Sequence, residues 1–259
     1  MSDRPAERPG GTPDRPDPEL RTNHLGQPIG AELVSWVPPP RPTAESLSGT
    51  WSSLERFDLD RHVASLWREF SADEEGRMWT YLPFGPFSDA GEFEATAAVL
   101  AANPDMSFYA VVDRADGAAV GLLAYLRIDP TGGSIEVGAV MLSPRLQRTR
   151  VATEAIFLVA DHAFELGYRR FEWKCDALNE PSRRAAIRFG FAYEGTFRQA
   201  TVYKRRTRDT AWFAMVDGDW PRRREDLLAW LAPENFDEQG GQHRPLARSG
   251  RDHLGAAAP

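Results

Sequence analysis

Apolar and polar residues recur in short periods along the middle of the chain, and these periods predict its elements. Over residues 61–72 the apolar side chains fall on one helical face, which indicates an amphipathic helix. Over residues 169–175, Phe171, Trp173 and Cys175 alternate with charged residues, as in a strand with one buried face. The same kinds of pattern predict further strands at 50–58, 107–113, 118–128, 134–142, 191–197 and 208–216, and helices at 90–102, 151–166, 181–188 and 226–231.

These elements follow one another in the order β-α-α-β-β-β-α-β-α-β-β. The first half contains hairpins, and the second half contains a strand, a helix and a strand in succession. Such a β-α-β unit joins parallel strands, so the sheet should contain at least one parallel pair. The predicted fold class is α/β (α+β), with a mixed central sheet of about six to seven strands flanked by helices.

A short polar loop rich in arginine connects the strand 134–142 to the helix 151–166. The first amides of a helix have no acceptor inside it, and the helix dipole favours negative charge there. Arg145, Arg148 and Arg150 belong to this junction and could add charge-assisted bonds to phosphate oxygens. The loop therefore predicts a ligand with several phosphates, and coenzyme A and a nucleotide both qualify.

The composition limits the kinds of partner that the chain is expected to bind. The chain has 259 residues, 42% of them hydrophobic, and a net charge of −7, which allows a sizeable core and argues against a nucleic-acid partner. Its one cysteine, Cys175, excludes an intrachain disulfide. No apolar run has the roughly 18 residues needed to span a bilayer, and the polar N-terminus is unlike a signal peptide. We expect a cytoplasmic protein that does not bind a membrane. The histidines are scattered without ligand spacing, so no metal site is implied.

The two ends of the chain differ from its middle. Residues 1–20 are rich in Pro, Arg, Asp and Gly, which predicts a disordered tail. We expect residues 21–48 to form an N-terminal extension packed on a domain of residues 49–217. Residues 218–259 should form a C-terminal helix and a polar tail.

Three motifs occur in order within this domain. Residues 135–138 read Ile-Glu-Val-Gly and precede Gln147–Ala152, residues 179–182 read Asn-Glu-Pro-Ser, and residues 188–191 read Arg-Phe-Gly-Phe, with Glu194-Gly195 after them. With these motifs, residues 49–216 resemble the GNAT N-acetyltransferase superfamily, and within it the RimJ/RimL-like branch. The resemblance implies the GNAT fold, with a β-α-β core that binds acyl-CoA. It also implies an acyl-CoA-dependent N-acetyltransferase with acetyl-CoA as co-substrate and no metal.

The resemblance assigns residues around the coenzyme. The central glycine of the family's acyl-CoA loop is Arg150 here, and Arg148 stands where glycine is common. Glycine lets a backbone approach a pyrophosphate closely, whereas the arginine guanidinium offers a fork of hydrogen-bond donors. We therefore expect side chains to contribute more of the contacts with the pyrophosphate here. The implied coenzyme-binding residues are Leu142, Gln147, Arg148, Thr149, Arg150, Val151, Ala152, Asn179 and Ser182.

Two residues are candidates for proton transfer. Glu136 lies inside an apolar strand, where burial should raise the pKa of its carboxyl unless it is paired. A raised pKa suits a general base that acts through a water, and the alternative is a structural partner for an arginine. Many GNAT enzymes carry a tyrosine as general acid on the helix 181–188, but this chain has Ala-Ala-Ile at 185–187.

In RimL-like enzymes a serine near the start of this helix is proposed to protonate the leaving thiolate, and Ser182 matches that serine. The family's asparagine at the position of Asn179 commonly contacts the pantetheine arm. The alternative for both residues is helix capping, which serine and asparagine do well.

The acceptor is expected to be a primary amine of a small molecule or of a protein N-terminus. Trp79, Tyr81 and Phe84 lie on an aromatic loop that, by the resemblance, walls the acceptor site, and a hydrophobic plug under the loop is the alternative. We favour a small molecule, because such a loop suggests an enclosed pocket. We expect a monomer or homodimer. Two other functions stay open, a non-catalytic acyl-CoA-binding or regulatory module and a nucleotide-binding protein.

Overall fold

The computed structural model describes residues 21–246, whose contacts divide the chain into two units that we treat separately. The first unit ends at Val37. It contains two short antiparallel strands, β1 (Arg21–Thr22) and β2 (Pro28–Ile29). The Asn23 side chain closes the turn between them by accepting bonds from two backbone amides. The tail predicted at residues 1–20 lies outside the described residues.

The second unit begins at Pro38 and is built on an eight-stranded mixed sheet. Its strands are β3 (Ser46–Ser48), β4 (Ser52–Arg56), β5 (Ser107–Asp113), β6 (Ala119–Asp129), β7 (Ser134–Leu142), β8 (Arg170–Asp176), β9 (Ala192–Tyr203) and β10 (Arg206–Val216). They pair in the order β3-β4-β5-β6-β7-β8-β10-β9, and the pair β7–β8 is parallel, as the sequence predicted. The additional strand is β3, which pairs with β4 from within the segment assigned to the extension.

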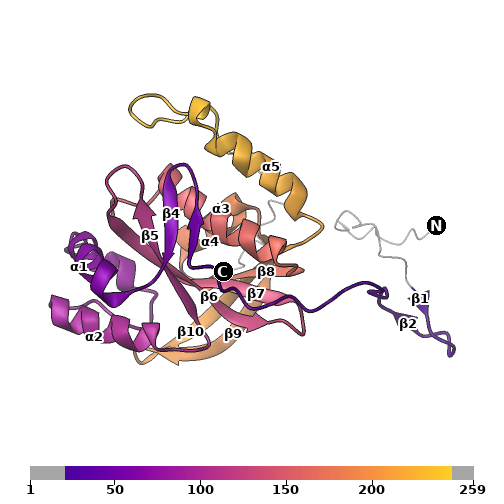
Figure 1. Cartoon of the computed structure of the whole chain (residues 1–259). Coiled ribbons are helices and arrows are strands. Elements are labelled where there is room, and N and C mark those ends of the chain that lie inside the picture. The colour runs from indigo at the N-terminus through magenta and orange to yellow at the C-terminus, as the bar shows by residue number, and fades with distance from the viewer. Residues whose placement is uncertain (1–20, 247–259) are drawn as a thin grey trace, which may run out of the picture. The chain divides into compact units, whose positions relative to one another are not determined.

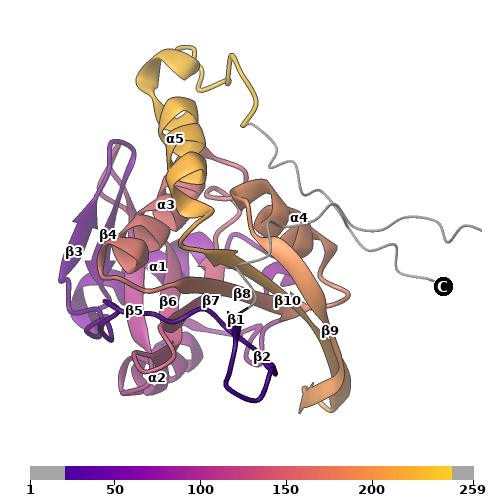
Figure 2. The same cartoon turned by 90° about the vertical axis from the view of Figure 1, so that its right-hand side faces the viewer.

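Helices cover both faces of this sheet (Figures 1 and 2). The helices are α1 (Leu59–Phe70), α2 (Ala90–Ala101), α3 (Arg150–Glu165), α4 (Glu180–Phe189) and α5 (Trp220–Leu231). Helices α1 and α2 lie on one face, whereas α3 and α4 lie on the other, with α5 packed along α3. An apolar core fills each side of the sheet, one around Phe70 and Phe93 and the other around Val159 and Phe171.

Polar caps define where four helices begin. Asp58, Asp89, Thr149 and Asn179 each accept a hydrogen bond from an amide in the first turn of α1, α2, α3 and α4, in that order. Each cap satisfies one of the donors that a helix start leaves free. The starts of α3 and α4 matter most here, because they border the candidate site.

Two elements are longer than the sequence predicted. Helix α5 begins at Trp220 rather than at residue 226. The arginines at 222–224 interrupt the apolar pattern of its first turns in the sequence. In the structure Arg223 is nevertheless buried and donates to the Phe189 carbonyl. Strand β9 continues to Tyr203 rather than ending at residue 197, because its exposed outer half pairs with β10 in a hairpin and needs no apolar alternation.

Candidate active site

A cavity of about 1040 Å³ opens where β7 ends and where α3 and α4 begin. Its wall combines the end of β7, the loop before α3, the first turns of α3 and α4, and part of the segment after α5. All of the predicted coenzyme-binding residues lie on this wall, namely Leu142, Gln147, Arg148, Thr149, Arg150, Val151, Ala152, Asn179 and Ser182. The fold thus gathers two distant parts of the sequence into one site.

Strand β7 is irregular where it meets the cavity. Its pairing with β8 runs from Ser134 to Val137 and then stops, so the two parallel strands part beyond that point. On its other side, Met141 pairs with Leu122 and Gly138 with Ala124, which leaves one residue too many in β7. Ala139 accommodates this bulge with a φ of 47°. A bulge of this kind bends the strand, and the residues that follow it, Val140, Met141 and Leu142, line the cavity.

The loop before α3 is fixed by its own polar side chains. The Thr149 hydroxyl donates to the Leu146 carbonyl at 2.7 Å and accepts from the Ala152 amide at 3.1 Å. The Gln147 side chain donates to the Leu142 carbonyl at 3.1 Å. Arg148 has a φ of 63°, the left-handed conformation that glycine adopts most easily. The loop therefore keeps the backbone form expected of a glycine although arginine stands there.

The three arginines of this junction have different surroundings. Arg145 is ion-paired with Asp113 at 2.9 Å and with Asp116 at 2.8 Å, and it does not contribute to the cavity wall. Arg150 lies 3.7 Å from the centre of the Trp51 ring and 5.1 Å from that of Phe236. Arg148 is exposed on the wall. Arg145 is thus held by carboxylates away from the cavity, whereas Arg148 and Arg150 line it, and their contact with a phosphate stays a prediction.

The first turn of α4 presents a hydroxyl to the cavity. Asn179 caps the helix by accepting from the Ser182 amide at 3.2 Å, so the capping alternative holds for Asn179. The Ser182 oxygen accepts a hydrogen bond from the Trp173 indole at 3.0 Å, which leaves the hydroxyl proton for another acceptor. Burial raises the pKa of the neighbouring Cys175 thiol, and the Ser182 hydroxyl opposes that rise in part. Cys175 is buried and has the small apolar role that the sequence favoured.

Comparison with known proteins agrees with this geometry. The model of the acetyltransferase (GNAT) domain matches residues 53–192. The chain belongs to the GNAT acetyltransferase family. A GCN5-related N-acetyltransferase from Brucella melitensis is 42% identical to it with a TM-score of 0.80, over 82% of this chain and 96% of that one. A probable GNAT-family acetyltransferase from Chromobacterium violaceum is 44% identical with a TM-score of 0.70, over 75% and 98% of the two chains.

More distant structures share the GNAT fold alone. The acetyltransferase from Salmonella typhimurium that modifies the N-terminal serine of ribosomal protein L7/L12 is 20% identical, with a TM-score of 0.55, over 65% of this chain and 96% of that one. No curated protein matches the chain. Membership of this family makes the chain an acyl-CoA-dependent acetyltransferase, which disfavours the alternative of a nucleotide-binding protein.

One cation on the wall of this cavity was not predicted from the sequence. Arg188, in the last turn of α4, lines the cavity and donates to the Thr153 hydroxyl at 3.1 Å. Its guanidinium lies 4.8 Å from the centre of the Trp230 ring, and none of the described carboxylates forms an ion pair with it. The residue was visible in the motif at 188–191, but nothing in that motif separates a ligand contact from a solvated arginine.

Glu136 is paired with an arginine, which was the structural alternative for this residue. It is buried on the sheet face opposite α3, and its Oε2 lies 3.0 Å from both Arg127 Nε and Lys174 Nζ. Burial raises the pKa of its carboxyl, and Lys174 and Arg127 oppose that rise in part. The two cations also face the Trp212 ring. Glu136 does not line the cavity, so its role as a base stays a prediction.

The aromatic loop supports the wall more than it forms it. Trp79 is 3% exposed, and its ring packs against Phe70, Phe84 and Phe87. Neither Trp79 nor Phe84 lines the cavity, so the plug alternative describes both. Tyr81 does line it, and its hydroxyl donates to the Leu178 carbonyl at 3.1 Å. This bond ties the loop to the start of α4.

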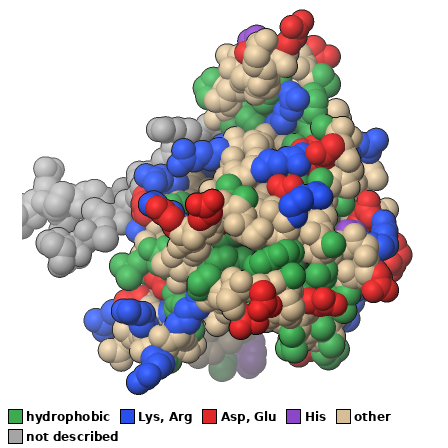
Figure 3. All heavy atoms as spheres, turned by 90° about the vertical axis from the view of Figure 1, so that its left-hand side faces the viewer, with side chains coloured by type: hydrophobic (Ala, Val, Ile, Leu, Met, Phe, Trp, Pro, Cys, Tyr) green, Lys and Arg blue, Asp and Glu red, His purple; other side chains and the backbone are tan. Residues whose placement is uncertain are grey.

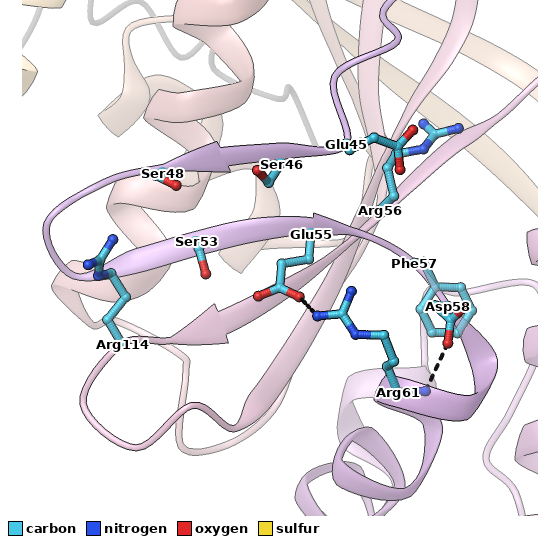
Figure 4. A pocket seen from close by; sticks show the side chains of 10 residues that line it. All are labelled: Glu45, Ser46, Ser48, Ser53, Glu55, Arg56, Phe57, Asp58, Arg61 and Arg114. Carbon is cyan, nitrogen blue, oxygen red and sulfur yellow. Dashed lines mark hydrogen bonds and ion pairs between the residues drawn. The ribbon is translucent and has the colours of Figure 1, made fainter.

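A second hollow of about 710 Å³ lies beside β3 and β4, away from the coenzyme-binding residues. Figure 4 shows that its side chains are mostly polar and that Glu55 pairs with Arg61 there. Asp58 accepts from the Arg61 amide as the cap of α1. These groups satisfy one another, and none of the predicted site residues reaches this hollow.

Three further observations concern the surface, membrane-spanning helices and metal-binding groups. On the face at the left of Figure 1, acidic and basic side chains are interspersed above a band of hydrophobic ones (Figure 3). Among residues 21–246, no helix is both long and apolar enough to cross a membrane. Within the same residues, no group of His, Cys, Asp and Glu could hold a metal ion.

Proposed function

We propose that this GNAT enzyme transfers an acetyl group from acetyl-CoA to a primary amine of a small molecule or of a protein N-terminus. The observation that carries the proposal is the bulged end of β7, which opens onto the cavity beside the start of α3. The bulge frees backbone amides for the thioester carbonyl, and the helix start suits the pyrophosphate. Arg148 and Arg188 add positive charge on the same wall.

The chemical step is direct transfer. The amine, once deprotonated, attacks the thioester carbonyl, the carbon–sulfur bond breaks, and the coenzyme leaves as a thiolate. Ser182 donates its proton to that thiolate and regains, through water, the proton that the attacking nitrogen loses as the amide forms. Glu136 takes the proton of the ammonium through water, because burial raises the pKa of its carboxyl and so makes the carboxylate a better proton acceptor than an ordinary one. Most of the rate enhancement then comes from holding the two substrates in place.

The acceptor is proposed to be small. The wall near Tyr81 is tied to α4 and backed by packed aromatic rings, which suits a rigid pocket more than a long peptide groove. The RimJ/RimL-like motifs support a protein N-terminus as the second candidate, since the Salmonella typhimurium enzyme of that fold modifies an N-terminal serine. The buried, free Cys175 suits a reducing compartment, so a cytoplasmic location is part of the proposal. A monomer or homodimer stays a prediction.

An acceptor screen tests the proposal. The full chain is incubated with acetyl-CoA and two panels, one of small primary amines and one of short peptides with different N-terminal residues, and products are identified by mass spectrometry. Acetylated small amines support the preferred acceptor class, and acetylated peptides support the second. Binding of acetyl-CoA with no acetylated product from either panel would favour the non-catalytic module.

A further inference from the structure

The segment after α5 closes one side of the coenzyme cavity. Phe236, Gln239, Gly240 and Gln242 contribute to the wall, beside Trp230 of α5. None of these residues belongs to the motifs that resemble the family, which end before residue 217. They lie at the end of the cavity marked by Arg188, since the Arg188 guanidinium packs on Trp230.

This end of the cavity is the one away from the acceptor loop. Tyr81 is bonded to Leu178, just before α4, whereas Arg188 lies in the last turn of the same helix. An acetyl-CoA molecule whose thioester lies at the β7 bulge therefore has its phosphates and its adenine base directed toward the segment after α5. The helix start of α3 lies between the two ends.

Polar side chains fix the segment in a defined shape. The buried Asn235 donates to the carbonyls of Trp230 and Arg244 and accepts from the Arg244 amide at 2.9 Å. Asp237 accepts from the amides of Gln239 and Gly241 at 3.0 and 2.6 Å. Phe236 and Gln242 face each other as an antiparallel bridge. A loop held in this way loses little freedom when a ligand binds to it.

Arg150 links the segment to the coenzyme loop. Its guanidinium lies 3.7 Å from the centre of the Trp51 ring and 5.1 Å from that of Phe236. The Phe236 ring packs edge-on against Trp51 at 5.8 Å and against Trp230 at 5.1 Å. The arginine that replaces the family's glycine thus holds the segment against the start of α3. Cation–π contacts of this kind contribute roughly 0.5–2 kcal/mol each.

We infer that residues 236–242 are a further donor-binding element, which contacts the ADP portion of acetyl-CoA through the carboxamides of Gln239 and Gln242. This inference rests on the proposed function. The Gln242 Oε1 accepts from the Trp230 indole at 2.9 Å, so its amide hydrogens remain available to a phosphate or a base. Arg148 and Arg188 on the facing wall supply the charge that such a phosphate needs.

The test compares a long donor with a short one. Acetyl-CoA and acetyl-pantetheine share the thioester, but the second lacks the ADP portion. We expect Gln242→Glu, which keeps the acceptor for Trp230 and places a carboxylate at the ligand, to weaken acetyl-CoA binding by about tenfold. Gln239→Ala should weaken it by roughly threefold. The KM for acetyl-pantetheine should not change in either variant.

Gln199→Glu is the matched control, because it makes the same chemical change on β9, outside the cavity wall. It should leave the binding of both donors as in the wild type, and thermal melting should show all variants folded. If both folded variants bind acetyl-CoA with the affinity of the wild type, this inference alone is overturned. The same holds if the variants lose equal affinity for acetyl-CoA and for acetyl-pantetheine. A wild-type protein that binds no acetyl-CoA overturns the proposed function, and this inference with it.

Discussion

Ser182 has the position that a general acid needs, because it lines the cavity. Its oxygen accepts from the Trp173 indole, and its hydroxyl lies beside the Cys175 thiol. Glu136 is different, because two cations flank it and the cavity wall does not include it. The two proton-transfer assignments therefore need separate tests.

Ser182→Ala should lower kcat by about 10²-fold while the KM for acetyl-CoA stays near its wild-type value, because general acid catalysis acts on the transition state. The measurement is thiol release under conditions where chemistry limits the rate. Loss of the acceptor for the Trp173 indole should cost about 1 kcal/mol of stability, so melting curves accompany it. An unchanged kcat would rule out Ser182 as the acid.

Glu136→Gln should remove the acidic limb of the pH profile of kcat/KM. A base must be deprotonated to act, so activity rises with pH through the carboxyl's pKa, which burial places above the ordinary value. The profile is measured for wild type and for Glu172→Gln, which alters the other carboxylate paired with Arg127 and should keep the limb. If the acidic limb persists in Glu136→Gln, the base is another group.

The residues that the sequence predicted to bind the coenzyme all line one cavity, and their binding of the coenzyme stays a prediction. The sequence could not predict how the arginines divide. The carboxylates that hold Arg145 and the rings that hold Arg150 come from distant segments. Arg188 was missed for the same reason, since its exposure to the cavity depends on how α4 packs.

At the scale of elements, α3 anchors the β3–β4 turn. Glu154 is buried, and its carboxylate accepts from the amides of Thr50, Trp51 and Ser52 at 2.8, 2.6 and 2.6 Å. A Cβ at Gly49 would lie 2.3 Å from this carboxylate, so glycine leaves room for it. This β3–β4 turn also places the Trp51 ring against the Arg150 guanidinium.

Glu154→Gln should lower the free energy of unfolding by roughly 1.5–3 kcal/mol, because hydrogen bonds to a charged group are lost and at least one amide would face another donor. Denaturant titration gives this value. Glu165→Gln, an exposed change in the last turn of the same helix, is the control and should be neutral. Equal stability of the two variants would contradict the anchoring role.

Arg150→Gly should loosen the segment after α5 and weaken acetyl-CoA binding, although it restores the family's residue. The physical reason is the loss of the contacts with Trp51 and Phe236, worth about 1–2 kcal/mol of stability. Calorimetry with acetyl-CoA and a melting curve measure both effects. A tighter complex would show instead that the arginine obstructs the coenzyme.

At the scale of the whole molecule, the element order was enough to predict the mixed sheet and its parallel pair. The longer α5 and the wall built by the segment after it were not predictable, because polar residues conceal their buried contacts. Arg223 and Asn235 are examples, because both are buried. Arg223 donates to the carbonyl of Phe189, far away in the sequence, and Asn235 donates to that of Arg244 within its own segment. The sequence therefore predicted the part of the cavity wall that the family motifs carry, and it did not predict the part formed by the segment after α5.

The central claim is that the cavity at the bulged end of β7 binds acetyl-CoA and transfers its acetyl group to an amine. The most direct measurement is mass spectrometry of the acceptor panels after incubation of the full chain with acetyl-CoA. The account predicts amines that gain one acetyl group, in amounts that fall sharply with Ser182→Ala. No acetylated amine from any acceptor, with acetyl-CoA bound, would contradict it.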